Sequence, residues 1–64
     1  MFTRLLPHQV HAKVRPDGAV GPLASRRFEL LLDPAGSTQQ KRREASRTLR
    51  QLGYEARDIL IEAS

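Results

Sequence analysis

Basic side chains that could bind phosphate are concentrated in one segment of the chain, residues 37–52. Five positive charges against one negative charge give this segment +4, which equals the net charge of the whole chain. Arginine supplies most of this charge, and its planar guanidinium makes bidentate contacts with phosphate and with guanine. The charged residues of the segment are Lys41, Arg42, Arg43, Arg47, Arg50 and the acid Glu44.

A helix over 37–52 would gather the arginines on one face. At about 100° per residue, Arg43, Arg47 and Arg50 fall together on the side opposite the apolar residues. Such a face predicts binding to the phosphates or base edges of nucleic acid, with DNA favoured over RNA. The other residues of the predicted interface are Gln39 on this face and Arg42 and Lys41 at its margins.

Two other interpretations of the basic face stay open. It can be a solvated surface that aids solubility, since basic helices of this kind are common. It can also dock on an acidic protein partner. In that case the chain would be a small inhibitor, adaptor or assembly subunit, which would bind its partner through this helix or through an exposed face of the predicted sheet. Like charges four residues apart, such as Arg43 and Arg47, mildly destabilise a helix. A purely structural helix would therefore interleave more acids.

The chain carries no pattern that predicts catalysis, a metal site or a cofactor. Cysteine is absent, which excludes disulfides and thiolate ligands. His8 and His11 would point to opposite faces of a strand, so we expect two surface histidines and no shared metal. The glycines are scattered and form no phosphate-binding loop. We therefore expect a protein that is not an enzyme.

The length and hydropathy of the chain predict one small domain. Its 64 residues leave room for a single domain of marginal stability. No apolar run reaches the roughly 18 residues that cross a bilayer, and the N-terminus is too short and too polar for a signal peptide. We expect a cytoplasmic protein that does not contact membranes.

Two predicted strands precede the helix. Residues 9–15 alternate apolar and polar side chains, as in a half-buried strand. A Pro-Asp-Gly turn and a Gly-Pro break then lead to a second strand at 23–33, whose leucines fall on both faces. These strands should pair as an antiparallel hairpin. Residues 1–8 show no period and contain Pro7, so we expect a loose N-terminal arm or a short edge strand.

Cap residues mark both ends of the predicted helix. Ser37 is the expected N-cap, and Gln40 three residues later completes a capping box. Ala45, Leu49 and Leu52 form its apolar arc, which should face the sheet. The residue after the helix is Gly53, a type that commonly ends helices.

The last strand is predicted at 56–62, and the whole chain is predicted to be an α+β domain with the order β-β-α-β. The helix would cover one face of a three-stranded sheet, with a right-handed crossover if strands 23–33 and 56–62 run parallel.

The other face of this sheet would carry Leu31 and either Leu60 or the pair Ile59 and Ile61. A bare apolar face usually marks an interface. We therefore expect a homodimer, formed by stacked sheets or by joined edge strands.

Overall fold

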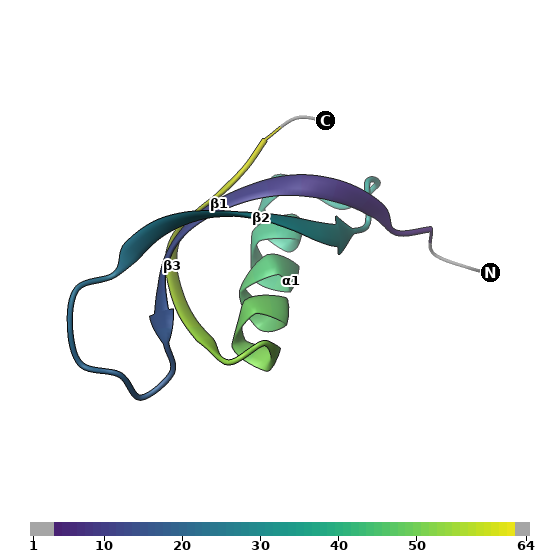
Figure 1. Cartoon of the computed structure of the whole chain (residues 1–64). Coiled ribbons are helices and arrows are strands. Elements are labelled where there is room, and N and C mark those ends of the chain that lie inside the picture. The colour runs from purple at the N-terminus through teal and green to yellow at the C-terminus, as the bar shows by residue number, and fades with distance from the viewer. Residues whose placement is uncertain (1–3, 63–64) are drawn as a thin grey trace.

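The structure, a computed structural model, describes residues 4–62, and residues 1–3 and 63–64 lie outside this range. The three strands form one sheet, and the helix packs on one face of it (Figure 1). The predicted α+β class and the element order β-β-α-β are confirmed. The elements are β1 (Leu6–Pro16), β2 (Ala24–Leu32), α1 (Thr38–Gln51) and β3 (Tyr54–Ile61).

β1 is the central strand, and β2 and β3 lie on either side of it and antiparallel to it. The hairpin of β1 and β2 was expected, and its register runs unbroken from Leu6 opposite Leu32 to Val14 opposite Ala24. β2 and β3 therefore run parallel to each other, but β1 separates them. The last strand pairs within its own sheet, and its partner is the first strand.

The core lies between α1 and the face of the sheet that carries Val10. Val10 and Leu32 are fully buried from the sheet side, and Ala45 and Leu49 are fully buried from the helix side. Alternate residues of a strand share a face, so Ala12 and Val14 join this core. Half-buried side chains surround it, namely Phe28, Tyr54, Ala56, Ile59 and Ile61.

A β-bulge interrupts the pairing of β3 with β1. His11 lies opposite Leu60 and Lys13 lies opposite Arg57, so two residues of β3 face one residue of β1. Asp58 lies in the bulge with a φ of 51°. Aspartate adopts this left-handed conformation more readily than most residues other than glycine.

The bulge decides which residues of β3 face the helix. Tyr54 and Ala56 pack on the core before it, and Ile59 and Ile61 pack on the core after it. The extra residue shifts the alternation of side chains by one position, so hydrophobic residues reach the core from both halves of the strand. Of the two alternatives for the open face, the structure selects Leu60, which is 55% exposed.

The caps of α1 agree with the prediction. The Ser37 hydroxyl accepts a hydrogen bond of 3.1 Å from the Gln40 N–H, and the Gln40 side chain accepts one of 2.9 Å from the Ser37 N–H. Gly53 follows the C-cap residue Leu52 with a φ of 95°, which favours glycine at this position.

Two predictions about single side chains were wrong. Leu52 is 61% exposed and does not face the sheet, because the helix ends before it. His8 is buried rather than on the surface, and it donates through Nδ1 to the carbonyl oxygen of Leu6 at 2.7 Å. His8 and His11 do lie on opposite faces, as expected.

β1 begins earlier than expected, so Pro7 lies inside it. The N–H of Glu62 donates to the carbonyl oxygen of Gln9, which shows that Gln9 directs its backbone groups towards β3. Pro7 is two residues away and shares this direction, but β3 does not extend as far as Pro7. Among the described residues, the missing N–H of proline therefore costs no hydrogen bond in the sheet. In the described part of the chain, no helix has the length and apolar character needed to cross a membrane.

Candidate nucleic-acid interface

The outer face of α1 carries three arginines, Arg43, Arg47 and Arg50, which we call the arginine face. All three are exposed, and together with Ser46 they line one shallow hollow. The buried residues Ala45 and Leu49 hold the opposite side of the helix against the sheet. The helix therefore presents the arginine face outwards, where the sequence placed it.

The remaining residues of the predicted interface surround the arginine face. Gln39 and Arg42 are exposed, and Lys41 is half-buried. Arg42 and Lys41 lie about 100° or more from the centre of the arginine face, because each residue turns the helix by about 100°. Arg42 can add charge at the edge of the arginine face, whereas Lys41 lies four residues before the buried Ala45 and therefore near the sheet side of the helix.

Among residues 4–62, no ion pair neutralises the positive charge of α1. Between residues 4 and 62, every ion pair of the structure lies within β3 or joins β1 to β3 or to Glu62 directly after it. The single acid of the helix, Glu44, pairs with none of the helix cations within that range. The five cations therefore have no carboxylate partner among the described residues, and the four arginines among them are exposed.

The acids of β3, together with Glu62 directly after it, pair instead with the basic residues of β1. Lys13 Nζ lies 3.4 Å from Asp58 Oδ2, and His11 contacts Glu62. Arg15 pairs with Glu55, so the three pairs form a row along β1. These contacts lie on the open face of the sheet and largely neutralise it, so the unpaired excess of charge remains on α1.

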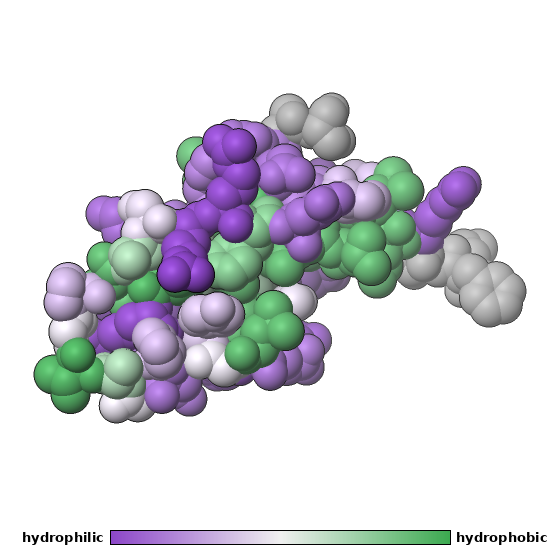
Figure 2. All heavy atoms as spheres, in the orientation of Figure 1, coloured by the Kyte–Doolittle hydropathy of each residue, from purple (hydrophilic) through white to green (hydrophobic). Residues whose placement is uncertain are grey.

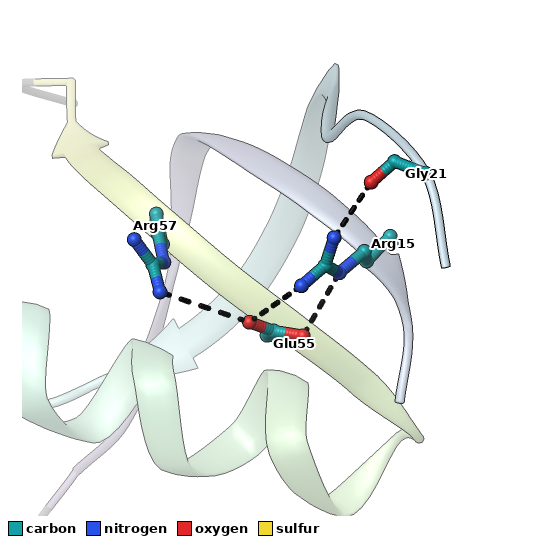
Figure 3. Close-up of polar contacts among 4 residues, drawn as sticks. All are labelled: Arg15, Gly21, Glu55 and Arg57. Atoms are coloured by element: carbon teal, nitrogen blue, oxygen red, sulfur yellow. Dashed lines mark hydrogen bonds and ion pairs between the residues drawn. The ribbon is translucent and has the colours of Figure 1, made fainter. Parts of the chain in front are cut away.

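The Arg15–Glu55 pair has the most complete geometry of this row. The Arg15 guanidinium donates to both carboxylate oxygens of Glu55, at 2.9 and 3.2 Å, and to the carbonyl oxygen of Gly21 at 2.6 Å (Figure 3). Arg57 approaches the same carboxylate at 4.0 Å. The hydrogen bond with Arg15 lowers the pKa of the Glu55 carboxyl, and it raises the pKa of Arg15.

Sequence reasoning missed this row of pairs, although a signal for it exists. Basic side chains recur at every second residue of β1, at His11, Lys13 and Arg15. The last segment of the chain contains three acids, Glu55, Asp58 and Glu62. Complementary charges favour cross-strand neighbours, so this match could have indicated that β3 pairs with β1.

The open face of the sheet is mixed rather than bare and apolar. Leu31 and Leu60 are 60% and 55% exposed there, but they lie on the two outer strands with β1 between them. Ile59 and Ile61, which were also predicted at a dimer interface, pack on the core. Exposed hydrophobic residues gather instead at the end of the molecule where β1 begins and β2 ends (Figure 2).

A second hollow lies on the open face and was not predicted. Its lining includes Arg27 of β2, Lys13 of β1 and Leu60 of β3. Lys13 is paired with Asp58, which also lines the hollow. The local charge is therefore lower here than on the arginine face, and the latter is the better candidate for binding a polyanion.

The chemistry available on the arginine face is the binding of anions. Across residues 4–62, the structure holds no cluster of three metal-ligating side chains. Guanidinium groups on one rigid helix face can contact successive oxyanions, and they neither donate electrons nor act as bases at neutral pH. No protein-family model, curated protein or solved structure matches this chain.

Proposed function

We propose that the protein binds nucleic acid through the arginine face of α1. The observation that carries the proposal is that Arg43, Arg47 and Arg50 are exposed on one helix face and pair with no carboxylate within residues 4–62. Each guanidinium can make bidentate, charge-assisted contacts with phosphate oxygens. The phosphate contacts would supply most of the affinity, and they would release counterions from the nucleic acid.

Duplex DNA is the favoured ligand because of its shape. The major groove of B-form DNA is wide enough to admit an α-helix, whereas the major groove of A-form RNA is too narrow for side chains to read. α1 lies on the outside of the sheet, so no other element covers its arginine face (Figure 1). Gln39 lies at the N-terminal end of this face and is a candidate for hydrogen bonds to base edges or phosphates.

Fluorescence anisotropy of labelled mixed-sequence duplex DNA tests the proposal. Titrations at about 50 and about 200 mM salt should show binding that weakens steeply as the salt concentration rises. Three phosphate contacts contribute about 2.7 to the slope of log K against log salt, which is about a 40-fold loss of affinity across this range. Absence of binding at the lower salt concentration would refute the proposal.

A pair of charge-matched variants locates the binding surface. The first is Arg43→Gln/Arg47→Gln/Arg50→Gln, and the control is Arg4→Gln/Arg26→Gln/Arg57→Gln. Each variant removes three arginines, so their net charges stay equal. The first variant should lose more than about tenfold in affinity and most of the salt slope, while the control should bind nearly as the wild type does. Equal losses would show that binding follows overall charge rather than the arginine face.

Contact with another protein is the second candidate function, and the exposed leucines favour it. Leu31 and Leu60 are each more than half exposed. A chain of 64 residues buries little apolar surface alone, so association would stabilise it. We propose a second copy of the chain as the first such partner, which gives a homodimer, and an acidic protein as a further partner of the arginine face. Binding of an acidic protein that competes with DNA and persists in the Leu31→Ser/Leu60→Ser variant would assign that contact to the helix.

A further inference from the structure

The two edges of the sheet differ in how well they can accept another strand. β2 forms one edge, and its nine residues pair with β1 in an unbroken register. β3 forms the other edge, where the bulge at Asp58 interrupts the ladder. α1 also lies closer to β3 than to β2. A long, regular edge presents unpaired N–H and C=O groups and is a template for pairing, so β2 is the open edge.

The hydrogen bond from Glu62 to Gln9 shows which residues of β2 direct their backbone outwards. The carbonyl group of Gln9 points towards β3, where it accepts this hydrogen bond, and therefore points away from β2. In an antiparallel pair, bonded and non-bonded positions alternate. Glu29 lies opposite Gln9, and its N–H and C=O therefore point away from the sheet. The same direction applies to Arg27 and Leu31, each two residues away.

The outward-facing stretch of β2 is complementary to itself in charge. If a second copy pairs with it about a two-fold axis at Phe28, Arg27 lies opposite Glu29 of the second copy, and Glu29 lies opposite Arg27. Both side chains are exposed and lie on the open face. A shift by one pair in either direction would place Arg27 against Arg27 or Glu29 against Glu29. The charges therefore favour this register over the two adjacent ones, since unlike charges directly opposite are favourable and like charges are not.

On the face of the sheet that α1 covers, the same register brings apolar side chains together. Phe28 is half-buried and meets Tyr54 edge-to-face, with ring centroids 5.6 Å apart. In the two-fold register it would face Phe28 of the second copy at a non-hydrogen-bonded position, where cross-strand side chains approach most closely. Aromatic pairs at such positions stabilise sheets. Pairing would thus cover the part of the Phe28 ring that the core and Tyr54 leave open.

We propose that two copies of the chain pair antiparallel through β2 and form one continuous six-stranded sheet. Opposite residues on paired strands share a face, so both α1 helices lie on the same side of this sheet. The two arginine faces would then be available to one ligand, although the dimer itself does not depend on nucleic-acid binding. This places the homodimer contact at the edge of the sheet rather than on its open face.

A charge swap tests the register. The molar mass of the wild type, Arg27→Glu, Glu29→Arg and the double variant is measured by sedimentation equilibrium across a wide concentration range. Each single variant places like charges opposite each other twice, and it should raise the dimer dissociation constant about tenfold or more. The double variant restores unlike pairs and should dimerise as the wild type does. Circular dichroism checks that every variant is folded.

Other results would overturn the proposal. A wild type that stays monomeric at the highest concentration, or a double variant no better than the single variants, contradicts edge pairing through β2. A dimer that survives both single changes but dissociates in Leu31→Ser/Leu60→Ser would instead assign the contact to stacked open faces. Because mass is measured without nucleic acid, failure of this proposal is distinct from failure of DNA binding.

Cysteine cross-linking gives a second, independent readout. The chain contains no cysteine, so a single introduced cysteine can only cross-link two copies. Phe28→Cys should form a disulfide dimer readily, because Cα atoms at non-hydrogen-bonded positions lie within the range that disulfides span. Leu60→Cys is the control, since Leu60 is exposed on the opposite edge strand. Faster cross-linking of Leu60→Cys than of Phe28→Cys would contradict the proposed pairing.

Discussion

Arg15 and Glu55 lie directly opposite each other on β1 and β3, and two hydrogen bonds of 2.9 and 3.2 Å join their side chains. A further N–H of Arg15 donates to the carbonyl oxygen of Gly21. One guanidinium thus connects the end of β1, the start of β3 and the hairpin loop. Since Arg15 and Glu55 are 40 residues apart, the contact forms only when the sheet is assembled.

This pair predicts that the protein loses stability in acid. Because Arg15 lowers the pKa of Glu55, the folded state binds a proton on this carboxyl less readily than the unfolded chain does. The stabilisation is fully present above the ordinary glutamate pKa of about 4.3. It disappears as the pH falls through the lower pKa of the folded state. Urea unfolding should show Glu55→Gln to be less stable than the wild type at neutral pH, with the difference vanishing in strong acid.

The control for this experiment is Arg57→Gln. Arg57 approaches Glu55 only at 4.0 Å and is largely exposed, so its removal should preserve most of the pH dependence. A Glu55→Gln variant whose deficit is the same at every pH would show that the Arg15–Glu55 contact does not stabilise the fold.

The bulge predicts that position 58 tolerates few residue types. Asp58 has a φ of 51°, and side chains other than glycine, asparagine and aspartate lose about 1 kcal/mol or more in this conformation. We expect Asp58→Ala to destabilise the protein by about this amount, while Asp58→Gly and Asp58→Asn stay close to the wild type. Lys13→Ala removes the same ion pair without changing the backbone at Asp58. If Lys13→Ala lowers the free energy of unfolding as much as Asp58→Ala does, the loss of stability comes from the ion pair and not from the backbone conformation.

The docking of α1 predicts a sharp contrast between two leucines. Leu49 is fully buried against the sheet, whereas Leu52 is 61% exposed. Leu49→Ala should lower the free energy of unfolding by about 2–5 kcal/mol, which is a large share of the stability of so small a domain. Leu52→Ala should change it by no more than about 0.5 kcal/mol. Chemical denaturation followed by helix content measures both, and equal costs would contradict the observed packing of the helix.

The arginine face predicts a conflict between binding and stability. Arg43 and Arg47 are four residues apart and repel each other, whereas a glutamate in place of Arg43 would attract Arg47. We therefore expect Arg43→Glu to stabilise the fold by about 0.5 kcal/mol at low salt while weakening DNA binding. Arg42→Glu is the control, because Arg42 has no arginine at three or four residues along the helix. A gain in stability of Arg43→Glu that persists in high salt would show that the effect is not electrostatic.

The helix and its caps could be predicted because their signals are local. Ser37 and Gln40 lie three residues apart and contact each other, and Gly53 directly follows the C-cap. Each feature depends on chain geometry over one helical turn. The position of the arginine face follows from the same local geometry. The exposure of Leu52 could not be predicted in this way, because a helical wheel does not show where the last turn of the helix leaves the sheet.

The pairing of β3 could not be read from alternation alone. Strand patterns show which residues share a face, but they do not name the neighbouring strand. The bulge complicates this further, because Ala56 and Ile59 both reach the core although they are three residues apart. Only a signal between distant segments, such as the charges of Lys13 and Asp58, carries the missing information.

The interruption of β3 at Asp58 also sets a limit on assembly. A sheet with two regular edges can add copies on both sides and grow into a fibre. In this protein the regular edge, β2, is on one side, and the bulged edge is on the other. If two β2 strands pair as proposed, both ends of the enlarged sheet would be bulged strands. In the proposed dimer, strand addition would therefore terminate at two copies, and a single residue with an unusual backbone angle would protect the protein from polymerisation.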